Sequence, residues 1–292
     1  MNKQSDRGSA KTALVTGASS GIGAATAERL AMAGYKVYGT SRRGAQAGQR
    51  SFEMLSLDVT RDESVTAAVN DVIRREGRID LLVNNAGVSL APAGAEESSI
   101  EQAQSIFDTN FFGIVRMTRA VVPHMRNQRS GRIINIGSIL GFLPAPYMAL
   151  YAATKHAVEG YSESLDHELR TWGIRVSVLE PAGTSTNIDA NAPQADAKLD
   201  EYREVRAVVG QSLTAMIENG DGPGVVADVV LKAASAARPK LRYTVGGVAW
   251  RLRWIRTFAP AGIVDAAIRK ELRLHTLTTS AHRTTVLEKS PI

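Results

Sequence analysis

The chain has 292 residues, of which 44% are hydrophobic and 22% charged, a composition typical of a folded protein with one large core or two ordinary domains. Cysteine is absent, which excludes disulfides, thiolate metal sites and cysteine nucleophiles. No apolar run approaches the roughly 18 residues that span a bilayer. Residues 1–10 also lack the apolar stretch of a signal peptide. We therefore expect a cytoplasmic protein with a short disordered lead-in.

The positive charge is concentrated near the C-terminus. The chain has a formal net charge of +6, but residues 238–273 contain nine Lys or Arg against two acidic residues, which amounts to +7. The rest of the chain therefore carries −1, which makes a poor surface for a polyphosphate backbone. We expect no nucleic-acid partner.

Short β-branched runs alternate with helical stretches, a pattern typical of βαβ units. The expected strands span residues 13–17, 35–41, 52–59, 79–87, 131–138, 174–181 and 241–246. The expected helices span residues 22–33, 62–76, 102–128, 149–172 and 224–237. This order predicts a single α/β domain over residues 11–247, built on a Rossmann-type doubly wound parallel sheet of about seven strands.

A glycine-rich turn follows the first expected strand and opens the first helix, with the sequence TGASSGIG over residues 16–23. Glycines allow a sharp turn and a close approach to a pyrophosphate, which lies at the positive end of the helix dipole. The alternative is a tight connection without a ligand. We expect a dinucleotide site that includes Gly17, Ser19, Ser20, Gly21, Ile22 and Gly23.

The end of the second expected strand indicates which dinucleotide is bound. An acidic residue at this point would bind the ribose 2′-hydroxyl of NAD, but the chain has Ser41, Arg42 and Arg43. Guanidinium groups suit the 2′-phosphate of NADP. The alternative is that both arginines are solvated loop charges. We favour NADP(H), with Arg42 as the stronger candidate.

Tyr151 and Lys155 lie four residues apart, on one face of an expected helix. A neighbouring ammonium stabilises a tyrosinate and lowers the phenol pKa from about 10, as an acid/base catalyst needs. Ser138 ends the fifth expected strand. An ordinary surface pair is the alternative for Tyr151 and Lys155. Tyr147 lacks a lysine four residues later, and we expect it in a wall of the substrate pocket.

Taken together, these motifs resemble the short-chain dehydrogenase/reductase family over residues 11–190. The resemblance rests on the glycine-rich turn, Asp58-Val59, NNAG at 84–87, Asn110, Ser138 and YAATK at 151–155. It implies a Ser–Tyr–Lys centre assisted by Asn110, and a nicotinamide cofactor on a Rossmann sheet. Asn110 is implied to hold a helix distortion and a water that serves the proton relay. Within the family, the chain is most similar to the retinol- and hydroxysteroid-dehydrogenase-like branch that uses NADP.

The resemblance also implies roles for individual cofactor-binding residues. It places Asp58 and Val59 beside the adenine, Asn85, Ala86 and Gly87 along the cofactor, Tyr151 and Lys155 at the nicotinamide ribose, and Pro181, Thr184 and Thr186 near the carboxamide. Ala182 stands where the family usually has glycine, so the backbone path after Pro181 departs from the family pattern. No metal is expected.

The implied reaction interconverts a carbonyl and an alcohol by hydride transfer. Tyr151 acts as acid and base, Lys155 lowers its pKa, and Ser138 binds the carbonyl oxygen. Two alternatives remain open. One is a 3-oxoacyl carrier-protein reductase, and the other is a non-catalytic regulator that binds NADPH.

The segments after the sixth expected strand are interpreted as the variable part of the chain. Residues 184–224 are expected to form a substrate lid, and residues 248–292 form a basic extension. A helix over 248–258, with Trp250 and Trp254 at helical spacing, suits either a membrane surface or the cover of a substrate cleft; we favour the cleft. The expected substrate is a bulky apolar carbonyl or alcohol, and the expected assembly is a homodimer or homotetramer.

Overall fold

The computed structural model describes residues 10–44, 50–186 and 192–274. Its strands form one parallel sheet in the order β3-β2-β1-β4-β5-β6-β7. The strands are β1 (Thr12–Val15), β2 (Lys36–Ser41), β3 (Glu53–Ser56), β4 (Leu81–Asn84), β5 (Gly131–Ile136), β6 (Ile174–Pro181) and β7 (Arg242–Val245). This confirms the predicted Rossmann-type doubly wound sheet. Except for Ala10, the expected lead-in lies outside the described residues.

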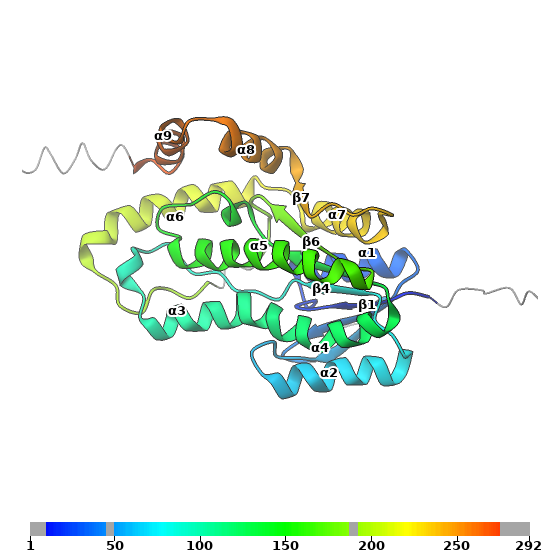
Figure 1. Cartoon of the computed structure of the whole chain (residues 1–292). Coiled ribbons are helices and arrows are strands. Elements are labelled where there is room, and N and C mark those ends of the chain that lie inside the picture. Colours follow the sequence, from blue (N-terminus) through cyan, green and yellow to red (C-terminus); the bar gives the residue numbers. More distant parts are fainter. Residues whose placement is uncertain (1–9, 45–49, 187–191, 275–292) are drawn as a thin grey trace, which may run out of the picture.

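Helices cover both faces of the sheet (Figure 1). They are α1 (Gly21–Met32), α2 (Asp62–Glu76), α3 (Ile100–Phe107), α4 (Gly113–Gln128), α5 (Ala149–Leu169), α6 (Arg203–Glu218), α7 (Pro223–Ser235), α8 (Gly246–Phe258) and α9 (Ala261–Glu271). Helices α1 and α7 pack on one face, and α2, α4 and α5 on the other. Every helix in the described part of the chain is too short or too polar to cross a bilayer.

The core consists of two apolar layers, one on each face of the sheet. Strand β1 is buried along its whole length. It therefore lacks the alternation of apolar and polar residues that is typical of a strand with one exposed face. On one face it meets Val65, Val69 and Val72, which lie along one stripe of α2. On the other face α7 supplies Val226 and Val230. The sheet is thereby held as a rigid platform for the loops at its carboxyl edge.

The strand order places the main crevice of the sheet beside β1. The chain runs outward from β1 through β2 to β3, and then returns to β4 on the opposite side of β1. In open α/β sheets, a ligand binds at the carboxyl end of the strands where the order reverses in this way. The loops after β1 and β4 are therefore the first place to look for a site.

The long helix expected over residues 102–128 is divided into three parts. Helix α3 continues through a π-helical turn, η2 (Asp108–Phe112), into α4. A π turn inserts an extra residue into the helical repeat, so the side chains before and after it point in different directions around the helix axis. Such turns are frequent at functional sites. Asn110 is buried within this turn. The helix expected over residues 102–128 is therefore interrupted at the residue where the family resemblance implies a distortion.

Asp166 fixes the end of α5 to the beginning of β6. Its buried carboxylate accepts hydrogen bonds from the Val176 amide and Arg175 Nε, each at 2.9 Å, and from Arg170. Burial alone would raise the pKa of Asp166, but these hydrogen bonds dominate and lower it to about 2. Helix α5 is therefore held firmly against the sheet at the end opposite Tyr151.

Candidate active site

The glycine-rich turn after β1 has the backbone geometry that its sequence predicts. Gly17 and Gly21 adopt φ values of +67° and +55°, in the region that favours glycine. A methyl group at Gly23 would lie only 2.2 Å from the carbonyl oxygen of Gly17. The turn leads directly into α1, whose first turn contains no acidic residue and begins after Ser20. The helix N-terminus is therefore open to an anionic group.

Thr16 and Asn85 join this turn to the loop after β4. The Thr16 hydroxyl oxygen accepts hydrogen bonds from the amides of Asn85 and Ala86, at 3.0 and 2.9 Å. The Asn85 side-chain amide donates in return to the carbonyl oxygens of Thr16 and Gly17, at 2.9 and 3.1 Å. The two loops at the switch point therefore form one rigid unit.

A cavity of about 1800 Å³ runs from this turn across the carboxyl edge of the sheet. It brings together most of the residues that the sequence singled out. Its lining includes Gly17, Ser19, Ser20, Gly21, Ile22, Ser41, Arg42, Arg43, Asp58, Val59, Asn85, Ala86, Gly87, Ser138, Tyr151, Lys155, Pro181, Thr184 and Thr186. Gly23 and Asn110 do not line it, because Gly23 packs beneath the turn and Asn110 is buried behind Gly87.

One end of the cavity carries cationic side chains. Arg42 and Arg43 are exposed there, at the end of β2. Nearby, Asp58 accepts hydrogen bonds from the backbone amide and the hydroxyl of Thr60, which together with the charge of Arg42 lower the pKa of Asp58. Arg50, which the sequence analysis did not single out, donates to the carbonyl oxygen of Ser19 at 2.9 Å. It braces the glycine-rich turn from outside the cavity.

Ser138, Tyr151 and Lys155 all line this cavity. Ser138 follows β5, and its hydroxyl oxygen accepts a hydrogen bond from the Leu140 amide at 3.1 Å, which leaves the hydroxyl hydrogen available to a ligand. Tyr151 and Lys155 lie one turn apart in α5, and Lys155 Nζ is 5.6 Å from the centre of the Tyr151 ring.

Lys155 carries its ammonium into a buried position. It donates a hydrogen bond to the carbonyl oxygen of Ile136 at 2.9 Å, at the end of β5. Burial lowers the pKa of Lys155 to about 8, and the charge of Glu159, one turn further along α5, opposes this shift. At pH 7 a pKa near 8 still leaves about nine amines in ten protonated. The site therefore holds a cation beside the tyrosine.

Asn110 supports the cavity wall from behind. Its side-chain oxygen accepts from the Val88 amide at 2.8 Å, and its amide group donates to the Val88 carbonyl oxygen at 2.9 Å and to Thr154 Oγ1 at 3.2 Å. Thr154 lies in α5 between Tyr151 and Lys155. Through Asn110, the π turn η2 thus connects the loop after β4 to the helix that carries the tyrosine and the lysine.

The segment after β6 forms the wall opposite the glycine-rich turn. A methyl group at Gly21 would lie 3.3 Å from Thr186 Cγ2, so Thr186 lies close beside the turn. Ala182 and Gly183 take the backbone from Pro181 past helix α6, where a methyl group at Gly183 would lie 2.8 Å from the carbonyl oxygen of Met216. Thr184 pairs with Asp221 in a single β-bridge.

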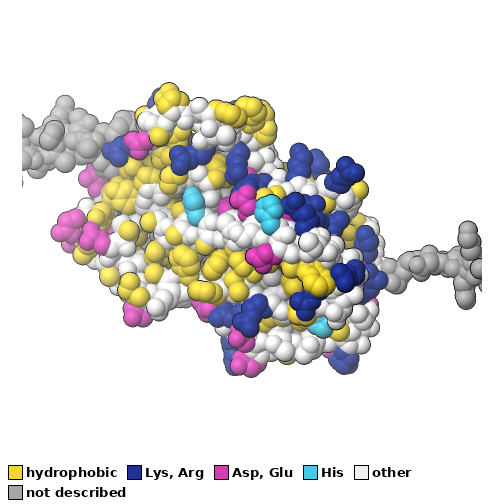
Figure 2. Space-filling model, in the orientation of Figure 1, with side chains coloured by type: hydrophobic (Ala, Val, Ile, Leu, Met, Phe, Trp, Pro, Cys, Tyr) yellow, Lys and Arg dark blue, Asp and Glu magenta, His cyan; other side chains and the backbone are white. Residues whose placement is uncertain are grey.

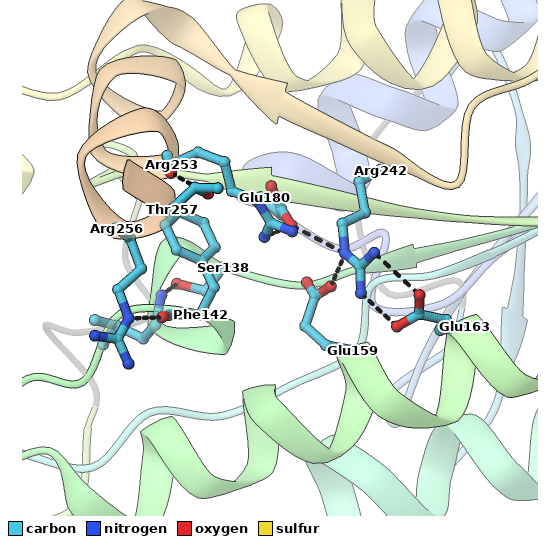
Figure 3. Close-up of polar contacts among 10 residues, drawn as sticks. Ser138, Phe142, Glu159, Glu163, Glu180, Arg242, Arg253, Arg256 and Thr257 are labelled. Atoms are coloured by element: carbon cyan, nitrogen blue, oxygen red, sulfur yellow. Dashed lines mark hydrogen bonds and ion pairs between the residues drawn. The ribbon is translucent and has the colours of Figure 1, made fainter. Parts of the chain in front are cut away.

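Two carboxylates are buried beside this centre (Figure 3). Glu180 precedes Pro181 in β6, and Glu159 follows Lys155 in α5. Arg242 Nε donates to Glu159 at 3.0 Å and lies 3.6 Å from Glu180, while Arg253 Nη1 donates to Glu180 at 2.6 Å. Burial and the negative charge of Glu159 raise the pKa of Glu180 to about 7, against the opposing charges of Arg253 and Arg242.

The same cluster connects helix α8 to the loop that carries Ser138. The Arg253 guanidinium lies 4.7 Å above the centre of the Phe142 ring, and Arg256 Nε donates to the Phe142 carbonyl oxygen at 3.2 Å. Gly141 leaves room for the Glu159 side chain, because a methyl group at Gly141 would lie 2.9 Å from Glu159 Cγ. Helix α8 is thus held against the active-site loop by directional contacts.

Sequence reasoning did not find several of these residues. Glu159 lies four residues after Lys155, so helical spacing could have revealed it, whereas Glu180 was hidden inside an apolar strand. Tyr147 was expected in the pocket wall, and this prediction was wrong. Its ring packs against Tyr202 with centroids 6.2 Å apart, and it is not among the described residues that line the cavity.

Comparison with known proteins identifies the family. A family model described as short chain dehydrogenase matches residues 11–197. The chain belongs to the short-chain dehydrogenases. It is 38% identical to a 3-ketodihydrosphingosine reductase of Bacteroides thetaiotaomicron over 236 residues, covering 80% of this chain and 87% of that protein. It is 35% identical to retinol dehydrogenase 8 of Bos taurus over 256 residues, covering 80% of each.

Solved structures share the same fold. A short-chain dehydrogenase from Streptomyces avermitilis superposes with a TM-score of 0.76 at 33% identity, covering 94% of this chain and 98% of that one. Two others are 28% identical: a metagenomic oxidoreductase in complex with NADP (TM-score 0.64, 81% and 97% covered) and a 3-ketoacyl-(acyl-carrier-protein) reductase from Brucella melitensis complexed with NADH (TM-score 0.69, 82% and 98% covered). The family of oxidoreductases is thereby established for this chain.

The buried carboxylate cluster predicts a pH-dependent loss of stability in Arg253→Met. The ordinary pKa of glutamate is 4.5, whereas the pKa of Glu180 in the folded protein is about 7. The folded protein therefore binds this proton more tightly than the unfolded chain does, and the free energy of unfolding falls as the pH rises between these two values. Without the charge of Arg253, the pKa of Glu180 in the folded protein rises further, so the free energy of unfolding keeps falling to higher pH. We expect the variant to lose about 2 kcal/mol at pH 8 and far less at pH 5.5, measured by denaturant unfolding.

Arg251→Met is the matched control, because Arg251 lies on the same helix with an exposed side chain. It should change the unfolding free energy by less than about 0.5 kcal/mol at both pH values. An equal loss at pH 5.5 and pH 8 in Arg253→Met would show that the arginine acts through packing alone.

Proposed function

We propose that this protein catalyses the NADP(H)-dependent interconversion of a carbonyl and an alcohol, on a bulky apolar substrate. The observation that carries the proposal is that Ser138, Tyr151 and Lys155 line the same cavity as the glycine-rich turn. A non-catalytic NADPH-binding regulator would have no need of that trio beside the cofactor groove.

The residues present fit a nicotinamide dinucleotide. The crevice between Gly21 and Thr186 would be narrowed by any side chain at Gly21, and the open N-terminus of α1 suits a pyrophosphate. Asp58 and Val59 line the cavity on the adenine side, and Asn85, Ala86 and Gly87 line it between the two ends. The exposed guanidinium of Arg42 suits a 2′-phosphate.

When bound, the nicotinamide supplies or accepts the hydride. Ser138 donates its free hydroxyl hydrogen to the carbonyl oxygen and orients it. Tyr151 donates a proton to the same oxygen as negative charge develops there, and takes it back when the reaction runs toward the ketone. The resulting phenolate is stabilised by the Lys155 ammonium.

Lys155 has a second role in this proposal. Its carbonyl partner at Ile136 fixes the ammonium where it can also bind the nicotinamide ribose. Asn110 holds the backbone of Val88 and the side chain of Thr154, and so keeps the wall in place for a water that returns the proton to Tyr151. Pro181, Thr184 and Thr186 close the carboxamide side.

The far part of the cavity favours an apolar substrate. Beyond Ser138, its walls come from α6, α8, α9 and the loop after β5. They include Leu143, Met148, Leu213, Met216, Val248, Leu252, Ile255, Val264, Ile268 and Leu272. Each methylene group that such walls take from water contributes about 0.8 kcal/mol. The two relatives named above as a 3-ketodihydrosphingosine reductase and a retinol dehydrogenase also support an apolar substrate.

A second candidate function is the reduction of a 3-oxoacyl group on an acyl carrier protein. Exposed cations on α8 and α9, among them Arg251, Arg256 and Lys270, lie on helices that line the cavity, and an acidic carrier protein would complement them. The Brucella structure, a reductase of this type, adds support.

We also propose that assembly into a homodimer or homotetramer uses α4 and α5.

Tyr151→Phe is expected to lower kcat by about 10²- to 10⁴-fold, because it removes the general acid. Binding of NADPH, measured by fluorescence titration, should change by less than about threefold. Tyr147→Phe is the matched control, since Tyr147 lies four residues earlier and outside the cavity lining. Wild-type turnover in Tyr151→Phe, followed by NADPH absorbance, would refute the assignment.

Arg42→Ala is expected to reduce the preference for NADPH over NADH by about 10- to 100-fold in kcat/KM, which corresponds to one lost charge-assisted hydrogen bond. The loss should appear in KM for NADPH and leave NADH kinetics nearly unchanged. Arg43→Ala, at the neighbouring position, should have a smaller effect. Equal losses with both cofactors would contradict a 2′-phosphate contact.

The apolar walls predict that kcat/KM rises along a series of 2-alkanones from six to ten carbons. Burial of each added methylene corresponds to about a threefold to fourfold gain. Aldose sugars should react poorly, and a 3-oxoacyl group should react equally well on pantetheine and on carrier protein. A strong preference for the carrier protein would favour the second candidate function, and tight NADPH binding without any turnover would favour the regulator.

A further inference from the structure

Helix α8 presents an exposed ridge of aromatic side chains. Trp250, Trp254 and Phe258 follow one another at a spacing of four, with ring centroids 5.9 and 4.6 Å apart. Their exposed fractions are 55%, 52% and 68%, and Ile263 at the start of α9 is 61% exposed. Exposed aromatic side chains of this size that form a continuous row mark an interaction surface.

Trp250 and Trp254 lie on the side of α8 that faces away from Val248 and Leu252. Val248, Leu252 and Ile255 line the cavity from the same helix. Trp250 and Trp254 each come two residues after a lining residue, which places them about 200° around the helix axis. The aromatic side chains are therefore not needed to close the cavity or to hold the helix to the domain.

The two helices that carry the ridge are rich in cationic residues. The described hairpin of α8 and α9, residues 246–274, contains six Lys or Arg and two acidic residues, Asp265 and Glu271. Arg253 is paired with Glu180, Arg256 donates to the Phe142 carbonyl oxygen, and Arg273 lines the cavity. Arg251 on α8 and the pair Arg269 and Lys270 on α9 are exposed. Figure 2 shows apolar side chains at the outer edge of the molecule over α8 and α9, with dark blue cationic side chains just beneath them.

We propose that the ridge of Trp250, Trp254, Phe258 and Ile263 docks on an anionic phospholipid surface. Tryptophan prefers the boundary between water and hydrocarbon, because its ring is large and apolar but carries one polar N–H group. The exposed cations of the two helices complement the negative charge of the lipid headgroups. A convex ridge inserts between lipids, whereas a protein partner would need a matching groove.

The structure supports the interpretation favoured from the sequence for residues 248–258, because Val248, Leu252 and Ile255 line the cavity, and the ridge adds a second surface on the same helix. Covering the cleft and touching a membrane were alternatives there. In the structure they belong to two surfaces of one helix, so the first does not exclude the second. The docking proposal is independent of the proposed function, since the ridge contains none of the described residues that line the cavity.

The test is co-sedimentation of the full-length protein with phosphatidylcholine vesicles that contain 30% phosphatidylglycerol. We expect binding to these vesicles, at least tenfold weaker binding to phosphatidylcholine alone, and release in 0.5 M NaCl. Trp250→Gln combined with Trp254→Gln should weaken binding at least tenfold. Trp172→Phe is the control, since Trp172 lies at the end of α5 against Arg126 and Arg129.

Three outcomes would overturn the proposal: no binding of the wild type to anionic vesicles, equal binding of the double variant, or conversion of a wild-type oligomer to a smaller species by the double variant. The last, seen by light scattering, would assign the ridge to contacts between copies of the chain. Turnover of a water-soluble 2-alkanone should be unchanged in the double variant. A failure of docking is thereby distinguished from a failure of the proposed catalysis.

Discussion

The site depends on a buried ammonium group. Lys155 is surrounded by protein, and its pKa falls to about 8 because burial disfavours the charged form. Its hydrogen bond to the Ile136 carbonyl oxygen and the nearby charge of Glu159 keep it a cation at neutral pH. Since Ile136 ends β5 and Lys155 belongs to α5, the sheet and the helix must keep their register for the cation to stay. The rigid core and the Asp166 anchor serve that requirement.

Glu159 opposes the burial effect on Lys155, but it needs partners of its own. It shares Arg242 with Glu180, and Glu180 in turn requires Arg253 from a helix near the C-terminus. Removing one member of such a group leaves another buried charge unpaired. The candidate site therefore depends on a segment about a hundred residues away in sequence, and α8 is part of its architecture rather than an appendage.

The sequence allowed the fold to be predicted from local signals, and local signals together with the family resemblance located the cofactor end of the cavity. The cavity walls from α6 and α9 were not singled out. Apolar runs located every strand, and the glycines of the turn after β1 located the crevice. Long-range polar contacts left no comparable signal. Glu180 looked like part of a buried strand, Arg50 like a loop charge, and Arg253 like one of several basic residues in an amphipathic helix. The helix distortion at Asn110 was implied only by the family resemblance, because an extra residue in a helical repeat hardly changes the apolar pattern.

These contacts also bear on which wall of the cavity can move. Helix α8 cannot swing away without separating Arg253 from Glu180, which would leave a buried carboxylate without its closest cation. Helix α6 meets the end of α9 differently, through an apolar cluster that includes Val205, Val209 and Leu272. Apolar contacts are not directional, so such surfaces can slide at smaller cost. Helix α6 is nevertheless also held by a directional contact, because Arg206 pairs with the buried carboxylate of Glu97. The substrate lid expected over residues 184–224 therefore stays a prediction, while α8 is a fixed wall that carries the aromatic ridge.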